Sequence, residues 1–343
     1  MARRVLAAAC FLCLTVSVGR GQITNVTNDQ ATPTPGVGHD YIRMLSETVN
    51  PANGSVSLRI QVPTTKGRGL TIPFSFAYDS SGVHHLEAGA PGSAVWWTNP
   101  GLLSPGGWSY SVPLLTNLYL SRTYTPGPVS YTCYYYNDYT FLDPSGGRHA
   151  LGLAYVLDPT GQGCTNQQNK PYSVSAGGDD SVQAWYPSSG SQTGTPLTVA
   201  DPDGTVYSFY GLSGAGGGLP ALIEDRNGNE ITVSSSGNGV FSYSDTAGRT
   251  VISSSGFGAT GNTVTVSGLS APSYTVYWGG ANTNFVRPTV QQVGTDSYCT
   301  GIPADTEQQQ AITSIHLSNG KYYTLKYETT FGLLNEIDYP TGG

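Results

Sequence analysis

Charged residues are scarce in this 343-residue chain. Asp, Glu, Lys and Arg together make up 11% of it, against about 25% in a typical globular protein. The 15 Lys and Arg residues are dispersed, and the formal net charge is -7. Because nucleic-acid binding requires clustered basic side chains that contact phosphates, the composition argues against a nucleic-acid partner.

Long helical and apolar segments are also missing. No apolar period of 3.6 residues persists over three turns, so we expect almost no helix. The longest apolar run, Val5 to Val18, follows two arginines and precedes two glycines. It is shorter than the roughly 18 residues that cross a membrane, so the pattern predicts a secretory signal peptide over residues 1–21 rather than a membrane anchor. No later stretch is long enough to span.

Recognisable catalytic motifs are absent too. The chain has no Gly-x-Ser-x-Gly elbow, phosphate-binding loop or paired Cys/His site. His84, His85 and Glu87 resemble a metal cluster, but neighbouring residues on a strand point to opposite faces. We interpret Asp179 and Asp180 as a solvated turn rather than an acid pair. The sequence therefore predicts no enzyme activity, no cofactor and no metal, and a secreted hydrolase ranks last among the alternatives.

Cysteine is rare in the mature chain. Removal of the signal peptide leaves Cys133, Cys164 and Cys299, which a secreted protein carries in an oxidising compartment. We predict a disulfide between Cys133 and Cys164, which bracket a predicted hairpin, and no partner within the chain for Cys299. Three buried thiols are the alternative.

Glycine, proline and tyrosine are abundant instead. The chain has 45 Gly, 22 Pro and 23 Tyr residues, a composition typical of an all-β protein with many turns. Apolar residues alternate strictly over 56–62 and again over 70–78, which predicts two half-buried antiparallel strands. Tyr131 to Leu142 is predicted to form another strand, whereas 83–130 and 158–196 are interpreted as mostly irregular.

Two tetrads, Asp225–Gly228 and Asp245–Gly248, contain the same hairpin-turn pattern. In a three-residue loop built on a type I turn, the Asp side chain bonds the turn backbone and the closing Gly adopts a left-handed conformation. This geometry sets Ile223 opposite Ile231, and it sets Tyr243 opposite Val251. A calcium loop at Asp225 is disfavoured, because the glycine falls at the fourth position rather than the sixth.

Further copies of the turn predict further pairs. Asp201–Gly204 sets Val199 opposite Tyr207, and the tetrad that contains Asn319 and Gly320 sets Ile315 opposite Tyr323. Weaker copies set Phe141 opposite His149 around Asp143–Gly146, and Ala77 opposite His85 around Asp79–Gly82. The repetition predicts an array of antiparallel hairpins.

At these residues the chain resembles the RHS-repeat, or YD-repeat, family of secreted bacterial proteins, related to toxin-complex shells and teneurins. The resemblance rests on three segments, Asp225–Ile231, Tyr243–Arg249 and Tyr339–Gly343. It implies a spiralling sheet that closes into a hollow shell around a C-terminal toxin or effector. The implied turn residues are Asp201, Gly204, Asp225, Gly228, Asp245, Gly248, Arg249, Asn319 and Gly320, and the implied wall residues are Val199, Tyr207, Ile223, Ile231, Tyr243, Val251, Ile315 and Tyr323.

The predicted organisation is a signal peptide (1–21), a flexible lead-in (22–48), an N-terminal β domain (49–196) and a repeat array (197–343) that stops in mid-hairpin, as in a fragment. The family's self-cleaving core has no counterpart here, so no cleavage activity is inferred. We predict a non-catalytic part of a secreted or cell-surface shell, whose partner is its own C-terminal continuation or effector. The alternative is a carbohydrate-binding or adhesion module that contacts glycan through exposed aromatic residues such as Trp96 and Trp97.

Overall fold

The computed structural model describes residues 42–44, 47–49, 54–64, 70–71, 73–83, 86–88, 94–96, 105–125, 128–145, 147–157, 164, 174–186, 196–210, 218–281, 285–287, 305–307 and 310–341. Within these ranges every strand pair is antiparallel and no α-helix occurs. Two short 3-10 segments are η1 (Ser80–Gly82) and η2 (Pro105–Gly107). The predicted all-β antiparallel class is confirmed.

A 13-stranded sheet forms the largest part of the molecule. Its strands follow one another in chain order, except that an insertion carrying β22 (Phe285–Arg287) and β23 (Asp305–Glu307) separates β21 from β24. The strands are β12 (Ala176–Gly178), β13 (Gln183–Trp185), β14 (Leu197–Ala200), β15 (Val206–Phe209), β16 (Leu222–Glu224), β17 (Glu230–Gly237), β18 (Val240–Asp245), β19 (Thr250–Ser255), β20 (Asn262–Val266), β21 (Tyr274–Gly280), β24 (Gln310–Leu317), β25 (Tyr322–Tyr327) and β26 (Leu334–Asp338).

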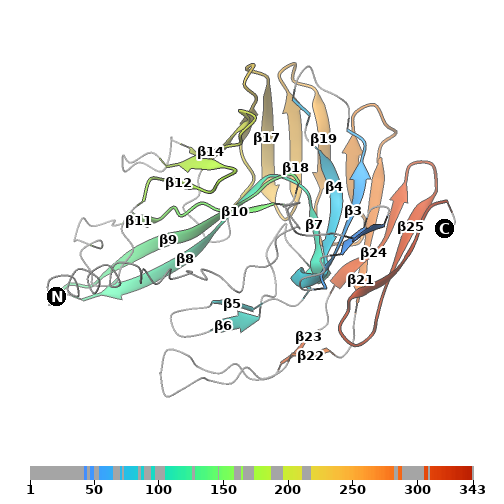
Figure 1. Ribbon diagram of the computed structural model, residues 1–343, viewed down its shortest axis with the longest axis horizontal. Coiled ribbons are helices and arrows are strands. Elements are labelled where there is room, and N and C mark those ends of the chain that lie inside the picture. The colour runs from blue at the N-terminus through green and yellow to red at the C-terminus, as the bar shows by residue number, and fades with distance from the viewer. Residues whose placement is uncertain are drawn as a thin grey trace, which may run out of the picture.

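A second sheet packs against this one. It consists of β1 (Ile42–Met44), β2 (Glu47–Val49), β3 (Val56–Val62), β4 (Phe74–Asp79) and β7 (Trp108–Tyr110), and Figure 1 shows β3, β4 and β7 among strands β18 to β25. Ring contacts join the two sheets: Phe74 and Tyr110 both contact Phe241, and Phe76 contacts Tyr274. The two sheets therefore share one core, which runs from Leu58 to Leu325.

A long arm projects from this body (Figure 1). It consists of β8 (Leu114–Tyr124) and β9 (Tyr131–Leu142), with β10 (Arg148–Ala150) and β11 (Tyr155–Leu157) paired to β9. The Cys133–Cys164 disulfide, as predicted, lies on one face of β9 and belongs to a small second core with Tyr131, Tyr135 and Val156. The remaining strands, β5 (Leu86–Ala88) and β6 (Ala94–Trp96), pair with each other.

Several strands lie where the sequence predicted irregular structure. β1 and β2 fall largely inside the predicted lead-in, β7 and β8 inside 83–130, and β12 and β13 inside 158–196. Most of these strands have only three residues, too few to show a period, and a bulge between Thr116 and Leu118 interrupts the alternation of β8. The boundary predicted between residues 196 and 197 stays a prediction, and the large sheet runs through that point.

One predicted hairpin is wrong. Asp79 does not lead into a hairpin that pairs Ala77 with His85. It caps η1 by accepting a 2.9 Å hydrogen bond from the Ser81 amide. The free edge of β4 pairs with β7 instead, so that Ala77 faces Ser109. Buried aromatic residues on both strands explain this choice, because a local hairpin would leave Trp108 outside the core.

Candidate functional site

The repeated turns adopt the predicted geometry. Asp225 Oδ1 accepts hydrogen bonds from the amides of Asn227 (2.8 Å) and Asn229 (2.9 Å), and Asp245 Oδ1 accepts from Ala247 and Arg249, both at 3.0 Å. The closing glycines all have positive φ: +89° at Gly204, +75° at Gly228, +73° at Gly248 and +79° at Gly320. Arg249 also forms an ion pair of 2.6 Å with Asp245. The tetrads are therefore structural turns, and Asp225 uses its carboxylate within its own loop.

The predicted cross-strand partners meet on the buried face of the large sheet. Val199 faces Tyr207, Tyr207 faces Ile223, and Ile223 faces Ile231, so four strands contribute one continuous buried row. Farther along, Ile315 faces Tyr323 as predicted, and Ile315 is fully buried. The three predicted pairs follow from the lengths of their turns, which set the register. The pair of Tyr207 and Ile223 was not predicted and joins two successive hairpins.

The pairing of Tyr243 with Val251 is wrong by one residue. The turn itself forms as expected, and Ser244 faces Thr250, but a bulge follows and Tyr243 faces Ile252. Ile252 is 1% exposed and also pairs with Val266 on the next strand, whereas Val251 is half-buried. The bulge places the larger side chain in the core, and a register read from the turn alone does not contain it.

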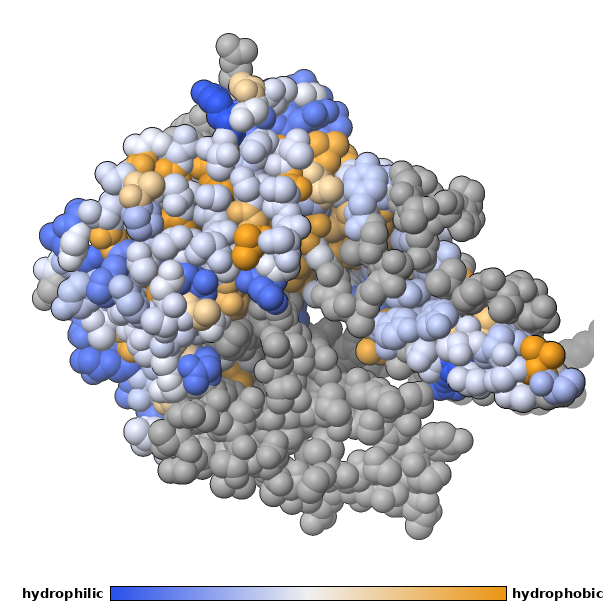
Figure 2. Space-filling view, turned by 180° about the vertical axis from the view of Figure 1, so that it is seen from behind, coloured by the Kyte–Doolittle hydropathy of each residue, from blue (hydrophilic) through white to orange (hydrophobic). Residues whose placement is uncertain are grey.

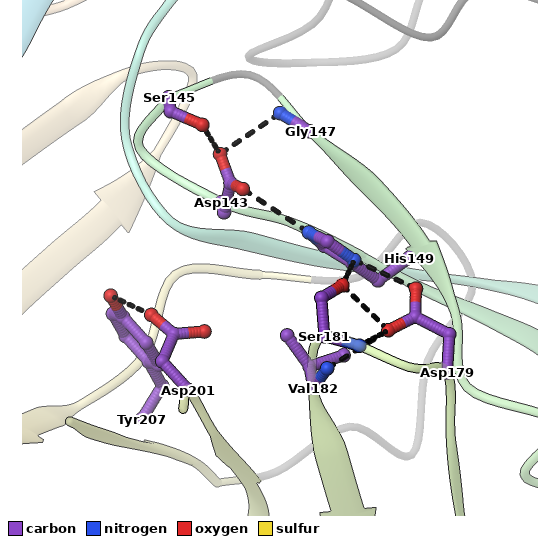
Figure 3. Close-up of polar contacts among 9 residues, drawn as sticks. All are labelled: Asp143, Ser145, Gly147, His149, Asp179, Ser181, Val182, Asp201 and Tyr207. Atoms are coloured by element: carbon purple, nitrogen blue, oxygen red, sulfur yellow. Dashed lines mark hydrogen bonds and ion pairs between the residues drawn. The ribbon is translucent and has the colours of Figure 1, made fainter. Parts of the chain in front are cut away.

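A polar cluster lies where the arm meets the first strands of the large sheet (Figure 3). His149, on β10, has a side chain only 12% exposed and lies between two carboxylates. Its Nε2 is 3.1 Å from Oδ2 of Asp143, in the β9–β10 turn, and its Nδ1 is 2.8 Å from Oδ2 of Asp179, in the β12–β13 turn. The Ser181 hydroxyl lies 3.0 Å from the same Nδ1 and donates to Asp179 Oδ1 at 2.8 Å.

The two carboxylates keep His149 protonated. The hydrogen bond to Asp143 is the main cause that raises the pKa of His149 to about 9, and Asp179 adds to it against the opposing effect of burial. Burial raises the pKa of Asp143, but hydrogen bonds from His149, Ser145 and Gly147 outweigh it and hold that pKa below its usual value. At neutral pH the cluster is therefore an imidazolium between two carboxylates.

This arrangement does not suit nucleophilic catalysis. A general-base histidine must be neutral and must accept the proton of the nucleophile. Both ring nitrogens of His149 face carboxylates, and the Ser181 hydroxyl, which is also 3.0 Å from Nδ1, donates to Asp179 Oδ1. The cluster is better suited to joining the turns that it connects.

The turns border a groove of about 750 Å³ at this end of the sheet. Carboxylates dominate its charged lining, which consists of Asp143, Asp201, Asp203, Asp225, His149 and Arg226. Burial raises the pKa of Asp201, the Tyr207 hydroxyl opposes this by donating a 3.0 Å hydrogen bond, and the neighbouring Asp203 raises the pKa further. Among the described residues, no group of three or more His, Cys, Asp or Glu side chains is arranged to hold a metal ion.

Several predicted site residues lie outside the described residues. These are His84, His85, Trp97 and Cys299, together with the side chain of Trp96. The glycan contact at Trp96 and Trp97 therefore stays a prediction. None of the described residues form a helix that is long and apolar enough to cross a membrane.

The cluster at His149 was missed by sequence reasoning. The turn at Asp143 correctly placed His149 opposite Phe141, but Asp179 was interpreted as a solvated turn. It does cap its own turn, accepting from the Ser181 amide at 2.8 Å, and it also pairs with a histidine 30 residues away. No local signal marks a contact of that separation. His149 belongs to the arm and Asp179 to the large sheet, so the contact forms only because these two parts of the fold lie together.

The fold and its turns define an all-β protein built from repeated antiparallel hairpins. No protein-family model matches the chain, and no curated protein matches it either. Among solved structures, the chain is similar to the crystal structure of TcdB2-TccC3-TEV, with a TM-score of 0.30 and 13% sequence identity over 87% of this chain. The match covers 17% of the length of that solved chain.

Proposed function

We propose that this chain is a non-catalytic structural segment of a secreted RHS-repeat protein, whose hairpins form part of the wall of a shell or scaffold. The observation that supports this best is the large sheet itself, in which 13 strands follow chain order and four of the connecting turns, closed by Gly204, Gly228, Gly248 and Gly320, share one design. A turn of this design joins two neighbouring strands directly, so repeated hairpins can extend one sheet.

In this segment the five-stranded sheet gives such a wall its second layer. A single layer of strands leaves one apolar face in water, and the five-stranded sheet covers that face with buried Phe74, Phe76, Trp108 and Tyr110. Figure 2 shows the molecule from behind, with apolar residues scattered among hydrophilic ones. Such a mixed surface is typical of a solvent-facing wall.

The proposed location is extracellular or at the cell surface. The predicted signal peptide over residues 1–21 supports export, and the Cys133–Cys164 disulfide is of a kind that persists in oxidising compartments. The proposed partner is the protein's own C-terminal continuation or an effector enclosed by it.

The test is the structure and mass of the mature protein isolated from its own host. We expect a species larger than 36.0 kDa in which a further strand pairs with the outer edge of β26, and in which electron cryomicroscopy shows an enclosed volume. A mature protein that ends at Gly343 and encloses nothing would contradict the shell. In that case carbohydrate binding becomes the leading function.

Carbohydrate binding is the second candidate function, supported by an aromatic strip on the large sheet. Tyr322 is 52% exposed and stacks on His316 at a centroid distance of 5.0 Å, and His316 contacts Tyr277 at 4.6 Å. Exposed rings of this kind pack against the C–H faces of sugars. Glycan-array binding should fall in Tyr322→Ala, or in Trp96→Ala and Trp97→Ala if the predicted tryptophan site is used. Absence of binding, or binding unchanged in all three variants, removes this candidate.

A further inference from the structure

The hairpin of β12 and β13 is the part of the large sheet that depends most on His149. It forms the first edge of that sheet, all three residues of β12 are exposed, and β13 buries only Ala184. A short edge element of this kind has low local stability. It is held by the buried side chain of Val182, by its pairing with β14 and by backbone hydrogen bonds between Val174 and Ala154. Its turn is also attached to β10 by the ion pair between Asp179 and His149, and this contact depends on charge.

We propose that His149 is a pH-operated pin: while protonated it holds the β12–β13 hairpin against β10, and loss of its proton releases the hairpin from the edge of the large sheet. The imidazolium of His149 forms one ion pair on each side. Asp143 contacts it from the arm, and Asp179 contacts it from the β12–β13 hairpin. A neutral ring has one N–H donor, so it can serve one of the two carboxylates but not both.

Release would uncover the next strand. β13 pairs with β14 through Gln183 with Ala200, Ala184 with Val199, and Trp185 with Thr198. Leu197 and Val199 on β14 are 1% and 0% exposed. Without the hairpin, β14 becomes an edge strand with unpaired backbone groups and apolar side chains, which is a template for pairing with another strand. The pin therefore controls whether this edge of the sheet is covered.

The charges around His149 favour its protonated form. From the β9–β10 turn it faces Asp143, and from the β12–β13 turn it faces Asp179, with Asp180 next in sequence. From the β14–β15 turn, Asp201 also interacts with it, and Asp203 and the hydroxyl of Tyr207 lie beside Asp201. The cations nearby are Arg59 on β3, which faces Asp143 and Asp79, and Arg148 on β10, which faces Asp79.

The direction of the pH effect follows from linkage. The pinned state holds the proton up to pH about 9. In the released state the ring has lost Asp179 but keeps Asp143, so its pKa lies below that of the pinned state and above its ordinary value of 6.5. Below the pKa of the released state both states are protonated and the opening equilibrium is constant. Between that pKa and 9 the released state alone loses the proton, so opening rises about tenfold per pH unit. Above 9 it levels off.

Hydrogen exchange followed by mass spectrometry measures this opening. Exchange of peptides that cover 176–185, corrected for the intrinsic rate at each pH, should show opening that rises as the pH approaches 9 in the native chain. His149→Gln should show high opening with no such rise, and His316→Gln, which changes a histidine elsewhere in the sheet, should behave like the native chain. The same rise in His149→Gln, or a flat profile in the native chain, would overturn the proposal.

A second measurement does not depend on any variant. The imidazole signals of His149, followed by NMR in the intact protein, should titrate near pH 9, and the amide signals of Asp179 and Ser181 should shift with the same midpoint. A midpoint at or below 6.5, or hairpin signals that do not follow the ring, would overturn the pin even if His149→Gln failed to fold.

Discussion

Trp108 donates a 2.6 Å hydrogen bond from its indole Nε1 to the hydroxyl of Tyr327, across 219 residues of sequence. The Tyr327 hydroxyl in turn donates to the carbonyl of Ile312 at 2.5 Å, and burial raises the pKa of Tyr327 well above its usual value. These hydrogen bonds join β7 of the five-stranded sheet to β24 and β25 of the large sheet. The five-stranded sheet is therefore bonded to the large sheet as well as packed against it.

Trp108→Phe should destabilise the whole molecule. The indole is fully buried, so the change removes a hydrogen bond and leaves unfilled volume, and we expect the free energy of unfolding to fall by about 1–3 kcal/mol. Urea unfolding followed by far-UV circular dichroism measures this. Trp185→Phe is the matched control, because Trp185 is 44% exposed and its replacement should change stability by less than about 0.5 kcal/mol. Equal effects of the two changes would contradict the assigned contact.

Two tyrosines on the buried face should respond oppositely to loss of their hydroxyls. The hydroxyl of Tyr243 is buried with no hydrogen-bond partner among the described residues, whereas that of Tyr207 donates to Asp201 at 3.0 Å. Tyr243→Phe removes an unsatisfied polar group and should raise the free energy of unfolding by about 1 kcal/mol, while Tyr207→Phe should lower it by a similar amount. Thermal and urea unfolding of both variants measure these changes. If the free energy of unfolding changes in the same direction in both variants, the hydrogen bonding assigned to the two hydroxyls is wrong.

Acid should weaken the turn at Asp179. Burial raises the pKa of Asp179, but hydrogen bonds from Ser181, His149 and the Val182 amide outweigh it and lower that pKa to about 2 from 3.8. A carboxyl group whose pKa is depressed by folding stabilises the protein above its unfolded pKa, and this is lost as the pH falls from about 4 to 2. Urea midpoints measured across that range should decline less steeply in Asp179→Asn than in the native chain. If the urea midpoints of the variant and the native chain decline in parallel, Asp179 does not contribute to the loss of stability in acid.

The closing glycine of the central turn should be replaceable by Asn but not by Ala. Gly228 has a φ of +75°, and a Cβ added there meets nothing within 4 Å, so backbone conformation alone sets the cost. Gly228→Ala should lower the free energy of unfolding by about 1–2 kcal/mol, and Gly228→Asn by clearly less, because Asn tolerates the left-handed region. Chemical denaturation compares the two. If both variants lose the same free energy of unfolding, a side-chain contact and not the backbone conformation sets the cost.

The local features of this fold follow from its sequence. The Asp and Gly of each tetrad determine a turn, the turn determines the register, and so Val199 faces Tyr207, Ile223 faces Ile231 and Ile315 faces Tyr323. The same reasoning placed His149 opposite Phe141. All of these contacts close within a few residues, where the backbone geometry of the turn allows little choice.

The tertiary structure decided the rest. The bulge that pairs Tyr243 with Ile252 depends on which side chain best fills the core beneath the sheet, and the hairpin predicted at Asp79 was replaced because β7 pairs with the edge of β4. The contact between His149 and Asp179 forms because the arm and the large sheet lie together in the fold. Sequence patterns report only the preferences of a segment. Contacts between distant segments are set by the burial of apolar faces and by the pairing of strand edges, which depend on the whole chain.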